Sequence, residues 1–448
     1  MARTKLKFYI PLLIITVLSL TEGFFLFERG TLLGPELSSL LHFAASLAIG
    51  MFSIYILNNF QQRIEVEPES AYGFKFLSNR YISISVGIGF LFFAYIAYGA
   101  FKIHPIDHKD VISAGSDVIP QVMYFVKRFV AFEFPYNPIP IPEASYTLTP
   151  TYLPLQWLPY IAAELLGFDY RFIPVIIMVL ALSLFTRSIL RSELTQLLKF
   201  ILSFMPLVFI CFYYHTMNEV VDRTLEVLIA SYYILLCLAI VNHKKYVLLI
   251  VSLIICLLSR YSLLFWLPGF AMLYFYNFGA KKSIRILLGV VAGILLIYGP
   301  FVLKQGDIFI KGYNYYTQAS LSEWKIQDGQ VIKSYPPHLG LGLGLAVFVY
   351  KWGPIEIADK IDLIKNLHIY INLFVIICLS IYYYQNRDRL NFSLFAVFSL
   401  KISLSFFYGF IIIPYNYIYI VPMMMNFVII YLVAISTIST KSIFSKSY

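Results

Sequence analysis

Long apolar stretches separated by short polar connections dominate the sequence, and most are close to the length that crosses a bilayer as a helix, about 20 residues. They occur at 8–27, 37–57, 81–101, 171–190, 198–214, 224–242, 246–258, 263–279, 284–303, 367–384, 390–411 and 414–436. The stretch at 246–258 is the shortest of the series. The pattern predicts an all-α integral membrane protein with about twelve transmembrane helices.

Two long segments, 102–170 and 304–366, interrupt this series and divide the chain into five regions. Three groups of transmembrane helices, at 1–101, 171–303 and 367–448, flank them. In the first segment, apolar residues recur at helical spacing over 121–132, which is typical of a helix lying at the membrane surface. A second short surface helix is predicted at 153–167, after a proline-rich run. The apolar, glycine-rich piece at 338–352 is short, which favours a re-entrant or surface helix over a span.

Basic residues predict the orientation, because they concentrate in the cytoplasmic connections of membrane proteins. If the N-terminus lies inside, the inner connections hold the basic groups at 3–7, 63–80, 187–199, 244–245, 281–285, 387–389 and 441–446. The short outer connections then hold only Arg29, Arg223 and Arg260. We therefore expect both termini to be cytoplasmic in a cell (inner or plasma) membrane and both long segments to face outward. The first stretch follows MARTKLK without a clear cleavage site, so we expect a retained anchor.

The amino-acid composition excludes several classes of function. The chain of 448 residues is 60% hydrophobic and only 13% charged, which excludes an ordinary soluble protein. Its formal net charge is +10, and the lysines of the two long segments favour an anionic partner. No basic-aromatic module of a nucleic-acid-binding protein is present, and nucleic acid is not an expected partner. All four cysteines fall within the apolar stretches, so no disulfide framework is expected.

Carboxylates are few, and three of them lie just beyond the third apolar stretch. Asp117 stands in the small turn AGSD before a helical pattern, where it can cap the following helix. Asp107 and Asp110 precede it in HPIDHKD. With His104 and His108 they also form a candidate metal cluster, although a solvated loop start explains them equally well.

Two arginines, Arg260 and Arg223, lie at predicted outer ends of spans, where either can anchor the chain at headgroup level. Lys401 lies near the middle of an apolar stretch, where a lone charge is costly, so we expect it to face a cavity or a partner.

One combination of short motifs resembles a known family. The residues and motifs concerned are GSD (115–117), Tyr124, PYNP (135–138), TPTYLPLQWLP (149–159) and LLSRYSLLFWLPGF (257–270). This combination, with many spans and large outer segments, resembles the GT-C superfamily of membrane glycosyltransferases. It is most similar to the bacterial polyprenyl-phosphate-mannose-dependent mannosyltransferases.

The resemblance implies inverting transfer of a hexose or pentose from a polyprenyl-phosphate donor to an acceptor hydroxyl at the outer face, within membrane lipid. The acceptor is a glycan, glycolipid or protein. Asp117 would be the general base that takes the acceptor proton, with Asp107 and Asp110 as the alternatives, and no metal or other cofactor is expected. Arg260 is the first choice for binding the donor phosphate and Arg223 the second, since an arginine fork can hold two phosphate oxygens. Lys401 would also bind this phosphate. The residues expected to contact the substrates are Tyr124, Tyr152, Gln156, His215 and His338.

Two other function classes stay open. A ligase or polymerase of lipid-linked polysaccharide also has many spans and a basic outer loop, but its key loop comes late in the chain. A transporter or flippase of lipid-linked glycans would favour inverted repeats with broken spans, and no such symmetry is visible. Asp117 and Arg260 in one outer cavity would favour transfer chemistry over transport.

Overall fold

A computed structural model of the chain describes residues 2–59, 78–106, 118–141, 146–325 and 335–438. Nearly all of this structure is helical, and in the described residues eight helices are long and apolar enough to cross a membrane. The protein is therefore an all-α membrane protein, as the hydrophobic pattern predicted. Two further helices, α9 and α10, are apolar but shorter.

A helix occupies each of the twelve predicted apolar stretches. Their bounds are α1 (Ala2–Glu28), α2 (Pro35–Asn59), α3 (Asn79–Ile103), α7 (Phe172–Leu190), α8 (Gln196–Thr216), α9 (Leu225–Val241), α10 (Tyr246–Leu257), α11 (Ser262–Phe278), α12 (Ala280–Ile297), α16 (Ile357–Asn386), α17 (Phe392–Gly409) and α18 (Ile420–Ile438). The largest difference in a boundary is at α16, which begins at Ile357, not near 367, and the stretch at 284–303 is divided between α12 and α13 (Gly299–Lys304). The first turns of α16 bury Ile361 and Ile364 against the preceding segment.

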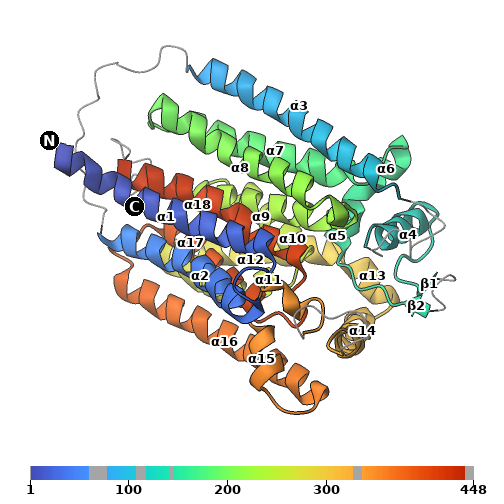
Figure 1. Cartoon of the computed structure of the whole chain (residues 1–448). Coiled ribbons are helices and arrows are strands. Elements are labelled where there is room, and N and C mark those ends of the chain that lie inside the picture. The colour runs from blue at the N-terminus through green and yellow to red at the C-terminus, as the bar shows by residue number, and fades with distance from the viewer. Residues whose placement is uncertain (1, 60–77, 107–117, 142–145, 326–334, 439–448) are drawn as a thin grey trace.

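Short elements form the two long segments. The first holds α4 (Val118–Val130), an antiparallel pair of strands, β1 (Ile139–Ile141) and β2 (Tyr146–Leu148), then α5 (Pro154–Trp157), η2 (Leu158–Tyr160) and α6 (Ile161–Leu166). The second holds α14 (Ile308–Glu323), η4 (Leu339–Leu341) and α15 (Ala346–Trp352), preceded by α13 (Gly299–Lys304). Further 3-10 turns are η3 (Asn218–Arg223) and η5 (Asn416–Tyr419). The elements of both segments gather at one end of the helical bundle, opposite the end where N and C are marked (Figure 1).

The two predicted surface helices differ from expectation in detail. In α4, Val122 and Phe125 are fully buried against the protein, and Phe132 lies beyond the helix end. The helix predicted at 153–167 is split into α5, η2 and α6. Pro159 lies at the break, and a proline cannot donate the backbone hydrogen bond that would continue α5.

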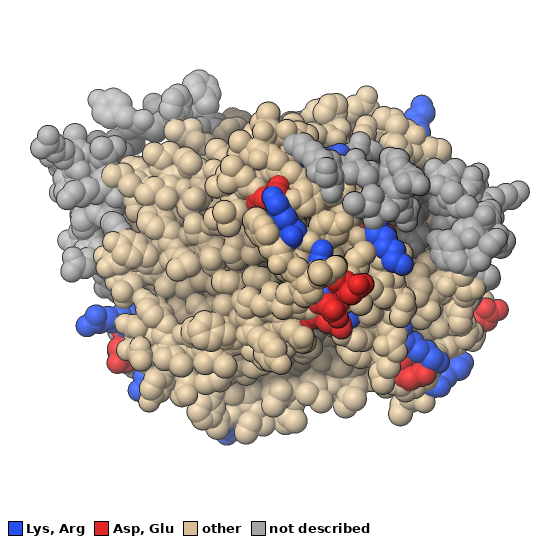
Figure 2. All heavy atoms as spheres, turned by 60° about the horizontal axis from the view of Figure 1, so that its bottom comes forward, with Lys and Arg blue, Asp and Glu red and all other residues tan. Residues whose placement is uncertain are grey.

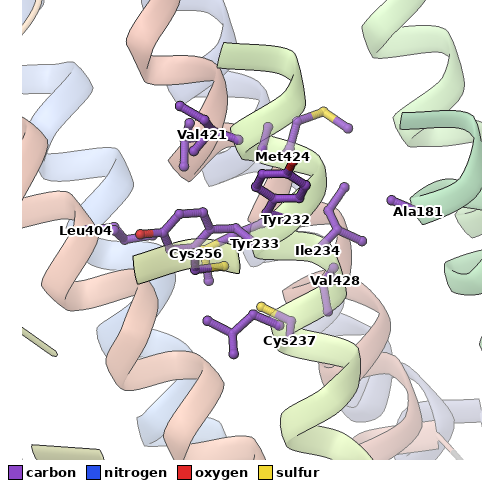
Figure 3. Packing of buried hydrophobic residues seen from close by; sticks show 14 of the residues in the cluster. Ala181, Tyr232, Tyr233, Ile234, Cys237, Cys256, Leu404, Val421, Met424 and Val428 are labelled. Carbon is purple, nitrogen blue, oxygen red and sulfur yellow. The ribbon is translucent and has the colours of Figure 1, made fainter. Parts of the chain in front are cut away.

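The centre of the bundle is built from α9, α17 and α18. The most apolar run of 18 residues around α18 is entirely buried. In α17, 94% of the corresponding run is buried. Helix α9 packs against α7, α10, α17 and α18, and its Tyr232, Tyr233, Ile234 and Cys237 lie among side chains of these helices (Figure 3). A helix that is apolar on all sides is expected to be enclosed by others.

The glycine-rich piece at 338–352 is too short to span a membrane and is instead packed into the bundle. Gly342 and Gly344 have φ values of +69° and +67°, which other residues adopt rarely. A Cβ atom on Gly342 would lie 2.8 Å from the Cβ of Ser38 and 2.9 Å from the Cα of Gly30. Glycine is therefore required for the close approach between this segment and the α1–α2 turn.

Charged side chains are unevenly distributed over the surface. On the face shown in Figure 2, Lys, Arg, Asp and Glu lie towards the left edge and over the right half, and a broad uncharged surface separates them. Many large apolar side chains are exposed along the helices, including those of Leu91, Leu180 and Leu296. Such a belt is expected where helices face lipid hydrocarbon.

Candidate functional site

Three of the stretches that carry the family resemblance meet at the end of the bundle where the short elements gather. Tyr136, of PYNP, donates a hydrogen bond to the Tyr152 carbonyl (3.0 Å) and accepts one from the Trp157 indole (3.3 Å). The Leu155 amide donates to the Leu258 carbonyl, 3.0 Å away. PYNP and TPTYLPLQWLP thus form one unit, and this unit contacts the connection between α10 and α11.

Aromatic side chains fill the interior of this unit. The Phe125 ring of α4 lies 5.1 Å from the Tyr136 ring and 5.5 Å from the Trp157 ring, and Phe301 of α13 lies 5.7 Å from Trp157. Ring pairs at these separations stabilise a packed interface beyond the area they bury. The aromatic cluster fixes α4, and with it the start of that helix at Val118, against the α5 segment.

Gln156 and Tyr124, two of the residues expected to contact the substrates, lie in this unit. In the structure the side chains of both contact other residues of the protein. The Gln156 carboxamide oxygen accepts a hydrogen bond from the Leu153 amide at 2.8 Å, which satisfies a buried donor that has no partner within the helix at the start of α5. Tyr124 packs beside Ile139 and Leu148 of the strands, and the Arg128 guanidinium lies 5.8 Å from its ring centre. Tyr152 uses its backbone carbonyl to hold Tyr136.

Arg260 lies between α10 and α11, two residues beyond Leu258, and forms an ion pair with Glu226 in the first turn of α9. The Arg260 side chain is 21% exposed and that of Glu226 4%. A carboxylate in the first turn is favoured by the helix dipole. The Arg260 Nε and the Glu226 Oε2 are buried, and neither has a hydrogen-bond partner among the described residues. The pair therefore keeps one free donor and one free acceptor.

Tyr316 of α14 lies near enough to Arg260 for the guanidinium to act on its phenol. Burial raises the pKa of the Tyr316 phenol to about 12, against the opposing effect of the nearby Arg260 guanidinium. The phenol thus stays protonated near neutral pH. Glu226 balances the charge of Arg260, so the site offers an anionic oxygen two donors, the free Arg260 Nε–H and the neutral Tyr316 O–H.

The remaining predicted residues are dispersed around this end of the bundle. Arg223 closes η3, and its guanidinium lies 5.6 Å from the Tyr417 ring centre. His215 is exposed in the last turn of α8. The His338 Nε2 lies 3.1 Å from a Glu323 carboxylate oxygen, so His338 already has a protein partner.

Lys401 lies elsewhere, inside the bundle. Its ammonium is 2.9 Å from both Glu22 carboxylate oxygens and 3.0 Å from the Pro422 carbonyl, and neither charged side chain is exposed to solvent beyond 1%. Asn426 donates to the same carboxylate at 2.6 Å. All three N–H groups of Lys401 have acceptors, so we do not include it in the candidate site.

The three candidate bases, Asp117, Asp107 and Asp110, lie at 107–117, outside the described residues. The structure describes α4 from Val118, the residue after Asp117, and this helix packs against η3, α5 and α6. Among the described side chains, no group of three His, Cys, Asp or Glu residues could hold a metal ion.

Two carboxylates were missed from the sequence. Glu226 and Glu22 each lie within an apolar run, and an ionisable residue in such a run is itself a signal of a functional or paired group. Applying that rule to acids as well as to Lys401 would have found both.

The comparisons with other proteins add nothing to this geometry. No protein-family model, no curated protein and no solved structure matches the chain.

Proposed function

We propose that this protein is a membrane glycosyltransferase that moves a hexose or pentose from a polyprenyl-phosphate donor to an acceptor hydroxyl at the outer face of a cell membrane. The observation that carries the proposal is the contact between the 149–159 stretch and the α10–α11 connection. It brings Arg260, with a free Nε–H, beside the unit held together by Tyr136. In the proposed topology the chain crosses twelve times and both termini are cytoplasmic.

The proposed reaction breaks the bond between the anomeric carbon and the phosphate oxygen as the acceptor oxygen attacks. The lipid phosphate leaves with the bonding electrons, and Arg260 and Tyr316 stabilise the charge that develops on it. Asp117 takes the acceptor proton as the new bond forms. Glu226 keeps the Arg260 guanidinium in position through their ion pair.

A transfer assay tests the proposal. The purified protein, reconstituted in liposomes, is supplied with a panel of radiolabelled polyprenyl-phosphate sugars and with glycan, glycolipid and peptide acceptors. We expect label to move from at least one donor to an acceptor and free polyprenyl phosphate to appear in equal amount. Movement of intact labelled donor between leaflets without sugar transfer would contradict the proposal.

That contrary result would support a transporter or flippase of lipid-linked glycans. One observation favours this second candidate: the Lys401–Glu22 pair is enclosed in the bundle, and intramembrane charge pairs often mark transport pathways.

A further inference from the structure

A pocket of about 610 Å³ lies beside the C-terminal end of α3, between α4, α6 and the start of α7. Its described lining includes Tyr98, Phe101, Met123, Phe168 and Phe172, which make the walls largely aromatic and apolar. A volume of this size accommodates a small ligand or a headgroup with the first carbons of its chain. Neither Arg260 nor Glu226 lines it, so the pocket is distinct from the candidate site.

The floor of the pocket is fixed by Arg171. This buried guanidinium donates to the carbonyls of Phe101 (3.2 Å) and His104, the last acceptors of α3, and pairs with Asp169 at 2.7 Å. It also lies 4.6 Å from the Phe101 ring centre. A cation at a helix C-terminus satisfies orphan carbonyls. Since Asp169 neutralises Arg171, this charge is not available to a ligand.

Two other cations line the pocket, Lys102 of α3 and Lys127 of α4, and both are exposed. Neither ammonium group is hydrogen-bonded or ion-paired to another of the residues that the structure describes. The other carboxylate of the described lining, that of Glu164, accepts a hydrogen bond from the Tyr170 hydroxyl. Burial, together with Glu164, raises the pKa of Tyr170 well above its usual value, so the phenol stays a donor to that carboxylate. Among the residues described around the pocket, Lys102 and Lys127 therefore keep unpaired ammonium groups, and the charges of the described lining sum to a positive value.

An apolar stripe on α3 leads to this pocket. Ile84, Ile88, Leu91, Tyr95 and Tyr98 follow one another at spacings of three and four residues, and each is more than half exposed. Residues at these spacings lie on one face of a helix. The next position in the series is Lys102. The surface thus changes from apolar to cationic along one helix face, as a lipid changes from its chain to an anionic headgroup.

We propose that the pocket binds the headgroup of an anionic phospholipid, with its phosphate held by Lys102 and Lys127 and an acyl chain along the α3 stripe. Bilayer phospholipid is the occupant we choose because the stripe of a membrane-embedded α3 meets bulk lipid continuously. A free phosphate ion would contact neither the aromatic walls of the pocket nor the apolar stripe on α3. The proposal does not depend on the proposed glycosyl transfer.

Photocrosslinking in nanodiscs tests this site. Phosphatidylcholine nanodiscs containing the protein receive a phosphatidylglycerol with a photoreactive group near its headgroup, and labelled peptides are quantified by mass spectrometry. We expect labelling within 98–106 and 123–127. Each lysine near an anionic lipid contributes about fivefold in binding, so Lys102→Gln/Lys127→Gln should lose most of this labelling. Lys102→Arg/Lys127→Arg should retain it.

Matched controls separate this site from general attraction to basic residues. Lys281→Gln/Lys282→Gln removes two exposed lysines from the start of α12 and should leave labelling at 98–106 unchanged. Equal labelling by photoreactive phosphatidylcholine, or full labelling of the double glutamine variant, would overturn the proposal. Displacement by inorganic phosphate, or by polyprenyl phosphate at a lower mole fraction than phosphatidylglycerol, would overturn the choice of phospholipid. None of these results depends on whether the protein transfers a sugar.

Discussion

Lys401 of α17 and Glu22 of α1 form an ion pair in the interior of the bundle, with the ammonium 2.9 Å from each carboxylate oxygen. Asn426 of α18 completes the group by donating to Glu22. The interaction joins α1, α17 and α18. Because both charges are removed from solvent, each depends on the other.

We expect Glu22→Gln to destabilise the protein by about 3–5 kcal/mol, because it leaves the Lys401 ammonium buried without a counter-charge. The double variant Glu22→Gln/Lys401→Met should regain much of that loss. Unfolding of the purified protein by graded SDS measures the difference, with Lys281→Met at an exposed position as the control. Equal stability of Glu22→Gln and the wild type would contradict the buried pair.

Gly342→Ala should destabilise the protein by more than the strain of a left-handed backbone alone. Gly342 and Gly167 have nearly the same φ, +69° and +70°, but a Cβ on Gly167 meets nothing within 4 Å. We expect Gly167→Ala to lose about 1 kcal/mol of stability from its left-handed backbone. Gly342→Ala adds a clash with Ser38 and Gly30 and should lose about 3 kcal/mol or more. A comparison of the two melting temperatures isolates the close approach, and similar values would contradict it.

Arg260→Lys keeps the charge but loses the planar fork that holds Glu226 and, in the proposed function, the donor phosphate. We expect kcat/KM for the donor to fall about 10- to 100-fold, as for the loss of a charge-assisted hydrogen bond. The KM of the acceptor should change little. Arg285→Lys on α12 is the control for the substitution itself. A loss seen equally for donor and acceptor would point to a structural defect.

Asp117→Asn should reduce transfer by about 10²- to 10⁴-fold if this carboxylate is the general base. The melting temperature should stay near the wild-type value, because Asn caps a helix about as well as Asp. If Asp107→Asn or Asp110→Asn abolishes transfer while Asp117→Asn does not, the base lies at one of those two positions. Retained activity in all three variants would contradict the proposed mechanism.

Cysteine accessibility tests the proposed orientation. In a background without the four native cysteines, we expect a membrane-impermeant maleimide added outside whole cells to label Phe132→Cys and Ile355→Cys. These side chains are 97% and 94% exposed, respectively. Lys281→Cys and Arg389→Cys should react only after the cells are permeabilised. The reversed pattern would place the candidate site on the cytoplasmic side.

The positions of the long helices could be predicted from the sequence because bilayer thickness sets both their length and their composition. The predicted start of α16 was wrong because the composition there does not follow bilayer thickness. The first turns of α16 carry Asp359, Lys360 and Asp362 around Ile361, so their hydropathy is that of a loop. They are helical because the two isoleucines pack against the preceding segment.

The candidate site was predictable only in part. The resemblance named Arg260 and the aromatic stretches, and the structure joins these stretches through Tyr136, Trp157 and Leu258. The partners of the charged residues were not predictable, since Glu226 precedes Arg260, and Glu22 precedes Lys401, by distances that no local pattern encodes. Lys401 was expected to need a cavity or a partner, and the folded chain supplies that partner.

The sequence separation of this ion pair has a consequence for biogenesis. Glu22 precedes Lys401 by 379 positions, which at about 5–20 residues per second takes roughly 20–75 s to synthesise. During that time α1 is already made but its counter-charge does not exist. The Glu22 side chain must then be protonated, stay in contact with water or be shielded by the insertion machinery. Assembly of the bundle around α1 can be completed only after α17 has been delivered.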